Sequence, residues 1–209
     1  MTEETPKELL ARVYALQGPE EAEEVYDGWA DRYDTDTLDG MGYVAPTVAV
    51  TRLLELTPEP GTVLDAGCGT GLVGAALAER VTVTVDGVDL SQGMLDQAAA
   101  RGVYRDLGKA NLTERLDIVD DAYDAALCVG TLTDGHVGPV AFDELVRVVR
   151  PGGLIVATVL SRVWESGGYR AHVDELVERG LVGLREAVTE RSYHTNEDIT
   201  CRLVVLDVR

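Results

Sequence analysis

One segment constrains the fold of this chain more than any other: a short apolar run that ends in an acid and a glycine-rich turn. Thr62–Leu64 predicts a strand, Asp65 follows it, and the alanine-rich run Leu72–Arg80 predicts a helix. Between them stand the turn glycines Gly67, Gly69 and Gly71. Glycine turns the backbone tightly and lets a ligand approach without a Cβ in the way. The first N–H groups of the helix are free to meet an anionic group. The segment therefore predicts a ligand-binding turn at the carboxyl end of a strand.

From this segment onward the chain alternates between expected strands and helices. Further strands are expected at Val81–Asp89, Ala125–Val129 and Leu154–Leu160, and further helices at Gln92–Arg101, Phe142–Arg150 and Tyr169–Arg179. Ser91 is a suitable N-cap for the helix that follows it. Two extended segments, about Val182–Tyr193 and Thr200–Val208, then predict an antiparallel hairpin. Such alternation favours parallel strands with right-handed crossovers. The expected class is α/β, with a Rossmann-like, seven-stranded, mostly parallel sheet, helices on both faces and the antiparallel hairpin at its C-terminal end.

The N-terminal part reads as helical throughout. Helices are expected at Lys7–Leu16, Glu20–Tyr33 and about Pro46–Leu56. In the second of these, Tyr26, Trp29 and Tyr33 recur at spacings of three and four and mark one helical face. At 209 residues the chain predicts a single domain. We expect residues 1–45 to form a helical lid and residues 46–209 the Rossmann-like core.

Charge and cysteine content narrow the class of protein. Asp and Glu number 37 against 18 Lys and Arg, so the net charge is -19. Such a chain repels a phosphate backbone, which argues against a nucleic-acid substrate. The acidic surface is either simple solvation or an adaptation to high salt. No apolar run approaches the ~20 residues of a membrane helix, and the acidic N-terminus indicates no signal peptide. Three widely spaced cysteines predict neither a disulfide framework nor a metal site, and favour a cytoplasmic setting.

The glycine turn allows two interpretations. Gly69–Gly74 fits the dinucleotide pattern GxGxxG, which is a weak match by itself. Asp65, two residues before Gly67, favours another ligand, because a carboxylate repels a pyrophosphate but attracts an ammonium group. Asp89, at the end of the next expected strand, is placed to accept hydrogen bonds from both hydroxyls of a ribose. An acid for an ammonium, glycines for the centre and an acid for a ribose together describe S-adenosylmethionine.

Three segments resemble motifs of the class I methyltransferases. Val63–Gly71 resembles their motif I, Val88–Leu95 their second motif, and Val149–Leu154 their post-motif turn. Two further segments, Tyr26–Asp34 and Val129–Val137, are similar to the Williams–Beuren-region methyltransferase-like family. These resemblances imply S-adenosylmethionine as cofactor and S-adenosylhomocysteine as product.

The resemblance also implies further cofactor contacts. Asn111 stands where such proteins usually place an acid near the adenine, Met94 is expected against the adenine face, and Tyr33, with Tyr26, is expected to close over the cofactor. The complete expected cofactor-binding set is Tyr26, Tyr33, Asp65, Gly67, Cys68, Gly69, Gly71, Asp89, Leu90, Met94, Asn111, Leu112, Val129 and Gly130. Several of these residues have purely structural alternatives, such as helix capping for Asp89 and core packing for Cys68, Met94 and Tyr33.

The expected activity is methyl transfer to the O, N or S atom of a small-molecule acceptor, by a monomer or homodimer. Alternatives are a protein methyltransferase, a cofactor-binding protein without catalysis, and an NAD(P)-dependent oxidoreductase. Methyl transfer needs alignment of the reactants, and a general base only if the acceptor is protonated. His136 is the first candidate for that base and Asp134 the second. His172 and His194 are expected to be ordinary packing or surface residues.

Overall fold

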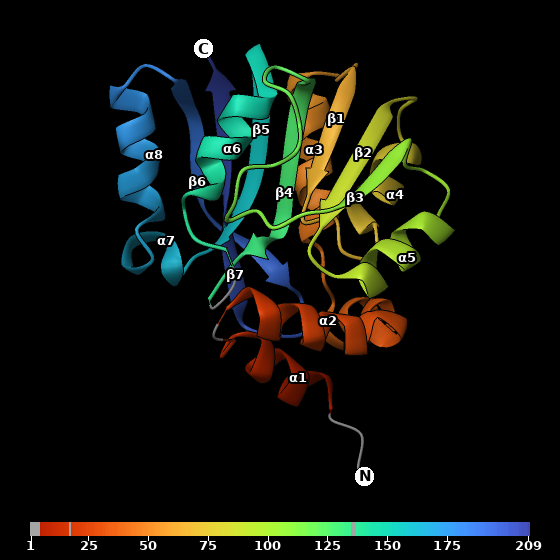
Figure 1. The fold of residues 1–209 in the computed structure, drawn as a ribbon. Coiled ribbons are helices and arrows are strands. Elements are labelled where there is room, and N and C mark those ends of the chain that lie inside the picture. The colour runs from red at the N-terminus through yellow and green to blue at the C-terminus, as the bar shows by residue number, and fades with distance from the viewer. Residues whose placement is uncertain (1–4, 17, 135–136) are drawn as a thin grey trace.

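The computed structural model describes residues 5–16, 18–134 and 137–209 and contains a seven-stranded sheet of order β3-β2-β1-β4-β5-β7-β6 (Figure 1). The strands are β1 (Thr62–Ala66), β2 (Thr84–Asp89), β3 (Asp106–Lys109), β4 (Tyr123–Leu132), β5 (Val149–Leu160), β6 (Val182–His194) and β7 (Ile199–Val208). Strands β1 to β5 run parallel to one another, and β7 pairs antiparallel with both β5 and β6. The expected α/β class and the terminal antiparallel hairpin are confirmed.

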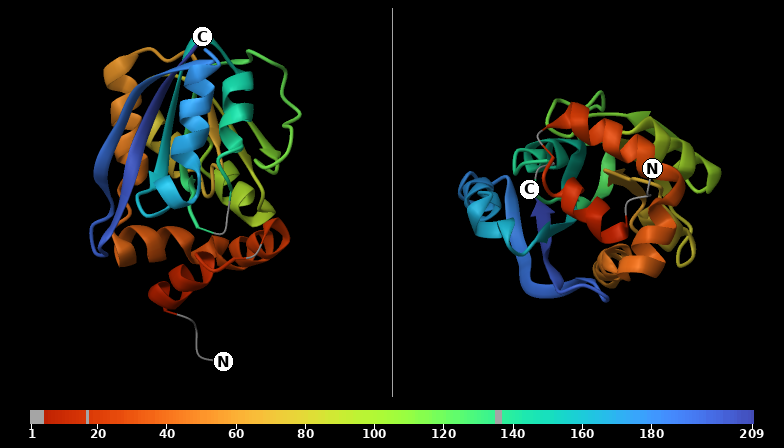
Figure 2. Two further views of the ribbon diagram at one scale, coloured as in Figure 1. Left: turned by 90° about the vertical axis from the view of Figure 1, so that its left-hand side faces the viewer. Right: turned by 90° about the horizontal axis from the view of Figure 1, so that it is seen from below.

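Helices cover both faces of this sheet. The core helices are α3 (Ala45–Leu56), α4 (Leu72–Ala78), α5 (Gln92–Ala100), α6 (Ala141–Val148), α7 (Val163–Ser166) and α8 (Tyr169–Glu178). Figure 1 shows α6 and α8 in front of the sheet with α3 behind it, and the side view in Figure 2 agrees. The apolar strands between them are nearly continuous runs of buried residues, as sheets covered on both faces require. Among the described residues, no helix is both long enough and apolar enough to cross a membrane.

The N-terminal helices lie across one end of the sheet instead of on its faces (Figures 1 and 2, red to orange). They are α1 (Pro6–Val13), α2 (Pro19–Asp34) and a π-helical turn, η1 (Thr35–Met41). Thr5 and Glu8 form a reciprocal capping box at the start of α1. Trp29 is buried in a separate small apolar cluster with residues of α1 and η1. This packing places α2 over the carboxyl ends of the parallel strands.

Two details of the sheet differ from the sequence-based expectation. The strand expected from Val81 begins only at Thr84, and β3 was not recognised from the sequence at all. β3 is four residues long, lies at the sheet edge and has no fully buried side chain, so it lacks the apolar pattern that identifies a strand. Ser91 caps α5 as expected: its Oγ accepts a hydrogen bond from the N–H of Met94.

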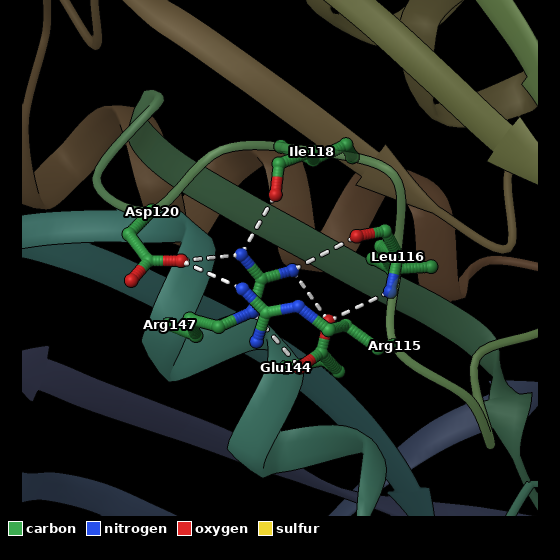
Figure 3. A network of polar contacts seen from close by, with 6 residues as sticks. All are labelled: Arg115, Leu116, Ile118, Asp120, Glu144 and Arg147. Carbon is green, nitrogen blue, oxygen red and sulfur yellow. Dashed lines mark hydrogen bonds and ion pairs between the residues drawn. The ribbon is translucent and has the colours of Figure 1, made fainter.

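Two residues of α6, Arg147 and Glu144, hold the long connection from β3 to β4 (Figure 3). The guanidinium of Arg147 donates to the backbone oxygens of Leu116 (3.2 Å) and Ile118 (2.7 Å) and pairs with Asp120 and Glu144. Glu144 in turn accepts the N–H of Leu116 at 2.8 Å. These charge-assisted bonds satisfy backbone groups that no strand or helix uses. They fix the connection whose first residues line the cavity described below.

Candidate functional site

The glycine turn after β1 folds back on the end of β2. The backbone N–H groups of Gly67 and Cys68 both donate to the carbonyl of Val88, at 2.8 and 3.0 Å. Gly67 has a φ of +75°, and a Cβ there would lie only 2.2 Å from Oγ1 of Thr131 on β4. Both the backbone conformation and the lack of space therefore require glycine at this position. The turn brings the ends of β1, β2 and β4 together.

Asp65 faces the inner side of this turn. Its side chain is fully buried, and Oδ2 accepts a hydrogen bond from the hydroxyl of Tyr104 at 2.6 Å. Burial raises the pKa of this carboxyl group to about 7. Its other oxygen, Oδ1, has no hydrogen-bond partner. The Tyr104 ring fits here because Gly74 has no side chain: a Cβ at Gly74 would lie 2.4 Å from the ring. The last glycine of the GxGxxG pattern thus makes room for Tyr104.

Asp89, by contrast, lines an open cavity. Its Oδ2 accepts the N–H of Gly69 at 2.8 Å, and its Oδ1 accepts the N–H of Ser91 at 2.9 Å. Burial raises the pKa of this carboxyl group above its usual range, while the backbone donors counteract the shift. A carboxylate has about four lone-pair sites, so each oxygen keeps acceptor capacity for a ligand hydroxyl.

The cavity has an empty volume of about 750 Å³, counting the part open to solvent. It lies between α2 and the ends of the parallel strands. Of the expected cofactor-binding residues, its lining includes Tyr26, Tyr33, Gly67, Gly69, Asp89, Leu90, Met94, Asn111, Leu112, Val129 and Gly130. Asp65, Cys68 and Gly71 do not belong to the lining. The structure therefore brings together most of the expected set and places Asp65 behind the turn.

Asn111 lines the cavity, but its amide is engaged within its own turn. The Oδ1 atom accepts from the backbone N–H and the hydroxyl of Thr113, and Nδ2 donates to Glu114. A hydrogen bond from an adenine amine to Oδ1 would thus compete with two existing donors. Among the residues that line the cavity, the apolar side chains of Leu90, Met94 and Leu112 suit a flat base.

Four acidic residues on one face of α2 attach the helix to the core, which the sequence analysis did not anticipate. Glu23 pairs with Lys109 at 2.5 Å, and Asp31 accepts from Gln97 at 2.8 Å. Asp27 accepts from the Ser91 hydroxyl at 2.5 Å and from the N–H of Gly93 at 2.9 Å. Asp34 accepts from the Thr70 hydroxyl at 2.5 Å and pairs with Arg101. The helical spacing of these acids is visible in the sequence. The same spacing is typical of a solvent-exposed helix face, so it does not predict contacts with the core.

The structure describes only one of the two residues that were expected to act in catalysis. His136 lies outside the described residues. Asp134 pairs with Arg162, whose Nε lies 2.7 Å from its Oδ2, and it lines a separate surface cavity beside α7. Asp134 is not among the residues that line the main cavity. A role for either residue in proton removal stays a prediction.

A second cavity adjoins the first, and we call it the aromatic chamber. It has an empty volume of about 340 Å³ and shares Tyr26, Tyr33 and Gly130 with the main cavity. Its other aromatic lining residues are Tyr14, Trp29, Tyr43, Tyr193 and His194. His194 was expected to be an ordinary packing or surface residue, and the structure shows that it is buried and lines this chamber. The contact that buries it, an antiparallel bridge to Tyr43, joins positions far apart in the chain and leaves no local pattern.

Comparison with known proteins agrees with this geometry. Residues 63–153 match the family model described as a methyltransferase domain. Human methyltransferase-like protein 27 is 39% identical over 184 residues, which cover 83% of this chain and 74% of that protein. Demethylmenaquinone methyltransferase of Mycolicibacterium vanbaalenii is 34% identical over 154 residues, covering 73% of this chain and 65% of that enzyme. The crystal structure of the [4+2]-cyclase SpnF shares the fold, with a TM-score of 0.68 and 18% identity, covering 93% of this chain and 98% of that one.

A mostly parallel sheet with an antiparallel last pair, and an acid-and-glycine site at the carboxyl ends of β1 and β2, define the class I methyltransferase fold. The chain belongs to the S-adenosylmethionine-dependent methyltransferases of that class. The human relative also confirms the narrower resemblance to the methyltransferase-like family. S-adenosylmethionine is therefore the cofactor of this enzyme.

Proposed function

We infer that the enzyme methylates a small molecule, and that this molecule binds in the aromatic chamber. The observation that carries the inference is the cover that the N-terminal helices form over the chamber. α1, α2 and η1 lie over the carboxyl ends of the strands and contribute Leu10, Val13, Trp29, Thr37 and Met41 to the lining of the chamber. A partly open space of about 340 Å³, counting the part open to solvent, admits a small ligand but no folded macromolecule. Relatives whose names state a substrate, such as demethylmenaquinone methyltransferase, also act on small molecules.

The residues of the main cavity fit S-adenosylmethionine better than a dinucleotide. Asp89 is the only carboxylate in the lining, and no lysine or arginine is present among the described lining residues. A pyrophosphate would meet the carboxylate without a balancing cation, whereas a cationic ligand is attracted to it. We assign Asp89 to the ribose hydroxyls, Leu90, Met94 and Leu112 to the adenine, and the turn Gly67–Gly69 to the amino-acid part. The oxidoreductase alternative has no comparable support.

The cofactor supplies a methyl group already activated by the positive charge on its sulfur. The chain then has to hold the acceptor in line with that methyl group and to exclude water. Tyr26 and Tyr33 line both cavities, so they stand at the junction where the two reactants meet. Both rings are half-buried in the N-terminal layer, and desolvation raises the pKa of each hydroxyl group. They therefore stay uncharged and act through packing and neutral hydrogen bonds.

A second candidate function is cofactor binding with a different reaction. The fold of SpnF, whose name is that of a cyclase, shows that this architecture does not by itself fix methyl transfer. A screen of small-molecule pools with labelled S-adenosylmethionine separates the two. Methyl incorporation into any pool supports the proposed function. Cofactor binding without incorporation into any pool, or incorporation only into protein, contradicts it.

Calorimetry with an Asp89→Ala variant tests the cofactor site. A carboxylate that holds two hydroxyls contributes roughly 1.5–3 kcal/mol, so the affinity for S-adenosylhomocysteine should fall by about one to two decades. NAD should bind neither protein. Asp106→Ala, which removes an exposed acid on β3, is the matched control and should bind normally. An unchanged affinity in the folded Asp89→Ala protein would remove this residue from the site, and tight NAD binding by the unmodified enzyme would end the assignment of the cavity.

A further inference from the structure

The aromatic chamber ends at an imidazole whose polar atom lacks a partner. His194 is 5% exposed, and its Nδ1 is buried without a hydrogen bond. The ring stands against Tyr193 and Tyr43, with centroid separations of 4.8 and 5.5 Å. Buried polar atoms are almost always hydrogen-bonded, and leaving one unpaired costs about 1–3 kcal/mol. A ligand that donates a hydrogen bond inside the chamber would satisfy this nitrogen.

The imidazole of His194 is uncharged near neutral pH. Burial lowers the pKa of His194 to about 4, and the attraction of Glu197 only partly opposes that shift. A neutral imidazole carries one proton, so one of its nitrogens is free to accept a hydrogen bond. The other titratable groups that face the chamber come from α1, α2, the segment before α3 and β6, and they are all tyrosines: Tyr14, Tyr26, Tyr33, Tyr43 and Tyr193. Desolvation raises the pKa of each hydroxyl above its ordinary value, so none of them is charged near neutral pH.

The lining of the chamber selects the chemistry of its occupant. The six tyrosine and tryptophan rings favour a flat molecule, because they offer faces and edges for ring packing. No lysine or arginine appears among the described lining residues, so a carboxylate or phosphate would remain unpaired. A cationic acceptor would be repelled by the sulfonium bound next to it. A neutral aromatic ring that carries one hydrogen-bond donor meets all three conditions.

We propose that the chamber binds a one-ring aromatic acceptor with a hydroxyl group, and that His194 accepts the hydroxyl proton at Nδ1 during methyl transfer. The oxygen lone pair forms the new O–C bond while the S–C bond breaks, and the electrons of that bond remain on sulfur. The proton passes to His194, so the positive charge lost at the sulfonium reappears on the imidazolium. The net charge of the buried site is thus unchanged by the reaction. This assignment rests on the proposed function.

Histidine-labelled protein allows a test that does not depend on activity. The chain has three histidines, so the His194 imidazole signals are assigned with a single His194→Gln variant. p-Cresol, benzylamine and benzoate are titrated into the complex with S-adenosylhomocysteine and followed by ¹⁵N spectroscopy. We expect p-cresol alone to bind and to shift the His194 signal. The variant should bind p-cresol roughly 2–10-fold more weakly and S-adenosylhomocysteine equally well. His172→Gln, at a histidine that pairs with Asp143 on the outer layer, is the matched control.

Each outcome is decisive for one of the two inferences. Binding of benzylamine or benzoate in place of p-cresol, or p-cresol binding without a His194 shift, overturns the acceptor and proton roles. Failure of the unmodified enzyme to bind S-adenosylhomocysteine overturns the proposed function instead. Where p-cresol is methylated, His194→Gln should slow turnover by roughly 10²–10⁴-fold. The rate should also be level across neutral pH. A rate that rises through about pH 6.5, the ordinary histidine range, would assign the proton to another histidine such as His136.

Discussion

Asp65 and Asp89 end neighbouring parallel strands, yet their surroundings give them different properties. Asp89 accepts two backbone N–H groups and borders the cavity. Asp65 has one hydroxyl partner, an unpartnered second oxygen and no exposed surface. Burial with few donors favours the neutral acid, whereas backbone donors favour the carboxylate. The first acid of the motif is therefore better suited to hold the turn from behind than to touch the ligand directly.

An Asp65→Asn variant tests this view through stability. The pKa of Asp65 is about 7 in the folded enzyme and near 3.8 in the unfolded chain. Between these values the folded protein holds a proton that the unfolded chain has released, so this group lowers stability as pH rises from about 4 to about 7. The amide side chain of the Asp65→Asn variant does not titrate, so the variant does not lose stability in this way. Urea unfolding at pH 4.5, 6 and 8 should show the variant gaining on the unmodified protein with each step. A difference in unfolding free energy that is constant with pH would mean that Asp65 titrates normally.

At the scale of elements, α2 joins the lid to the cofactor turn. Its acidic face reaches Ser91, Gly93 and Thr70, all of which lie in the turns or helix start around the cavity. Its aromatic face supplies Tyr26 and Tyr33 to both cavities. The helix therefore connects the packing of the acceptor chamber with the shape of the cofactor site.

An Asp27→Ala variant should loosen this connection. The change removes acceptors for the Ser91 hydroxyl and the Gly93 N–H, and capping contacts of this kind contribute about 0.5–2 kcal/mol. We expect faster amide exchange in α2 and several-fold weaker binding of S-adenosylhomocysteine, with exchange in β1, β4 and β5 unchanged. Glu24→Ala, an exposed acid on the same helix, serves as control. Equal exchange in all three proteins would show that apolar packing alone holds α2 in place.

At the scale of the whole molecule, charge is the dominant property. The chain carries a net charge of -19. Many arginines are paired with carboxylates, as in the clusters around Arg147 and Arg52, but the excess of acids remains and repels itself at low ionic strength.

Thermal unfolding across a salt series measures that repulsion. The Debye length falls from about 30 Å at 0.01 M to about 3 Å at 1 M salt, so molar KCl should raise the unfolding temperature by screening the acidic surface. The same series in sodium chloride checks that the effect is not specific to potassium. Equal stability at low and molar salt would contradict both the repulsion and the adaptation to high salt.

Much of the fold and part of the site could be predicted from the sequence because their determinants are local. The Val63–Gly71 and Val88–Leu95 segments contain the strand, acid, turn and cap residues in order, and most residues expected at the cofactor do line one cavity. β3 escaped prediction because a short edge strand has no apolar period.

Contacts between segments that are distant in the chain were decided only by the tertiary structure. The sequence by itself determined the α/β class and the cofactor, since both depend on residues within about one strand–turn–helix unit. The tertiary structure decided that Asp65 faces Tyr104, that α2 is attached by its acids, and that His194 meets Tyr43 in the aromatic chamber. Burial and the loss of hydrogen-bond partners arise only when these segments pack, and they set the chemistry of an aspartate or histidine that is otherwise ordinary.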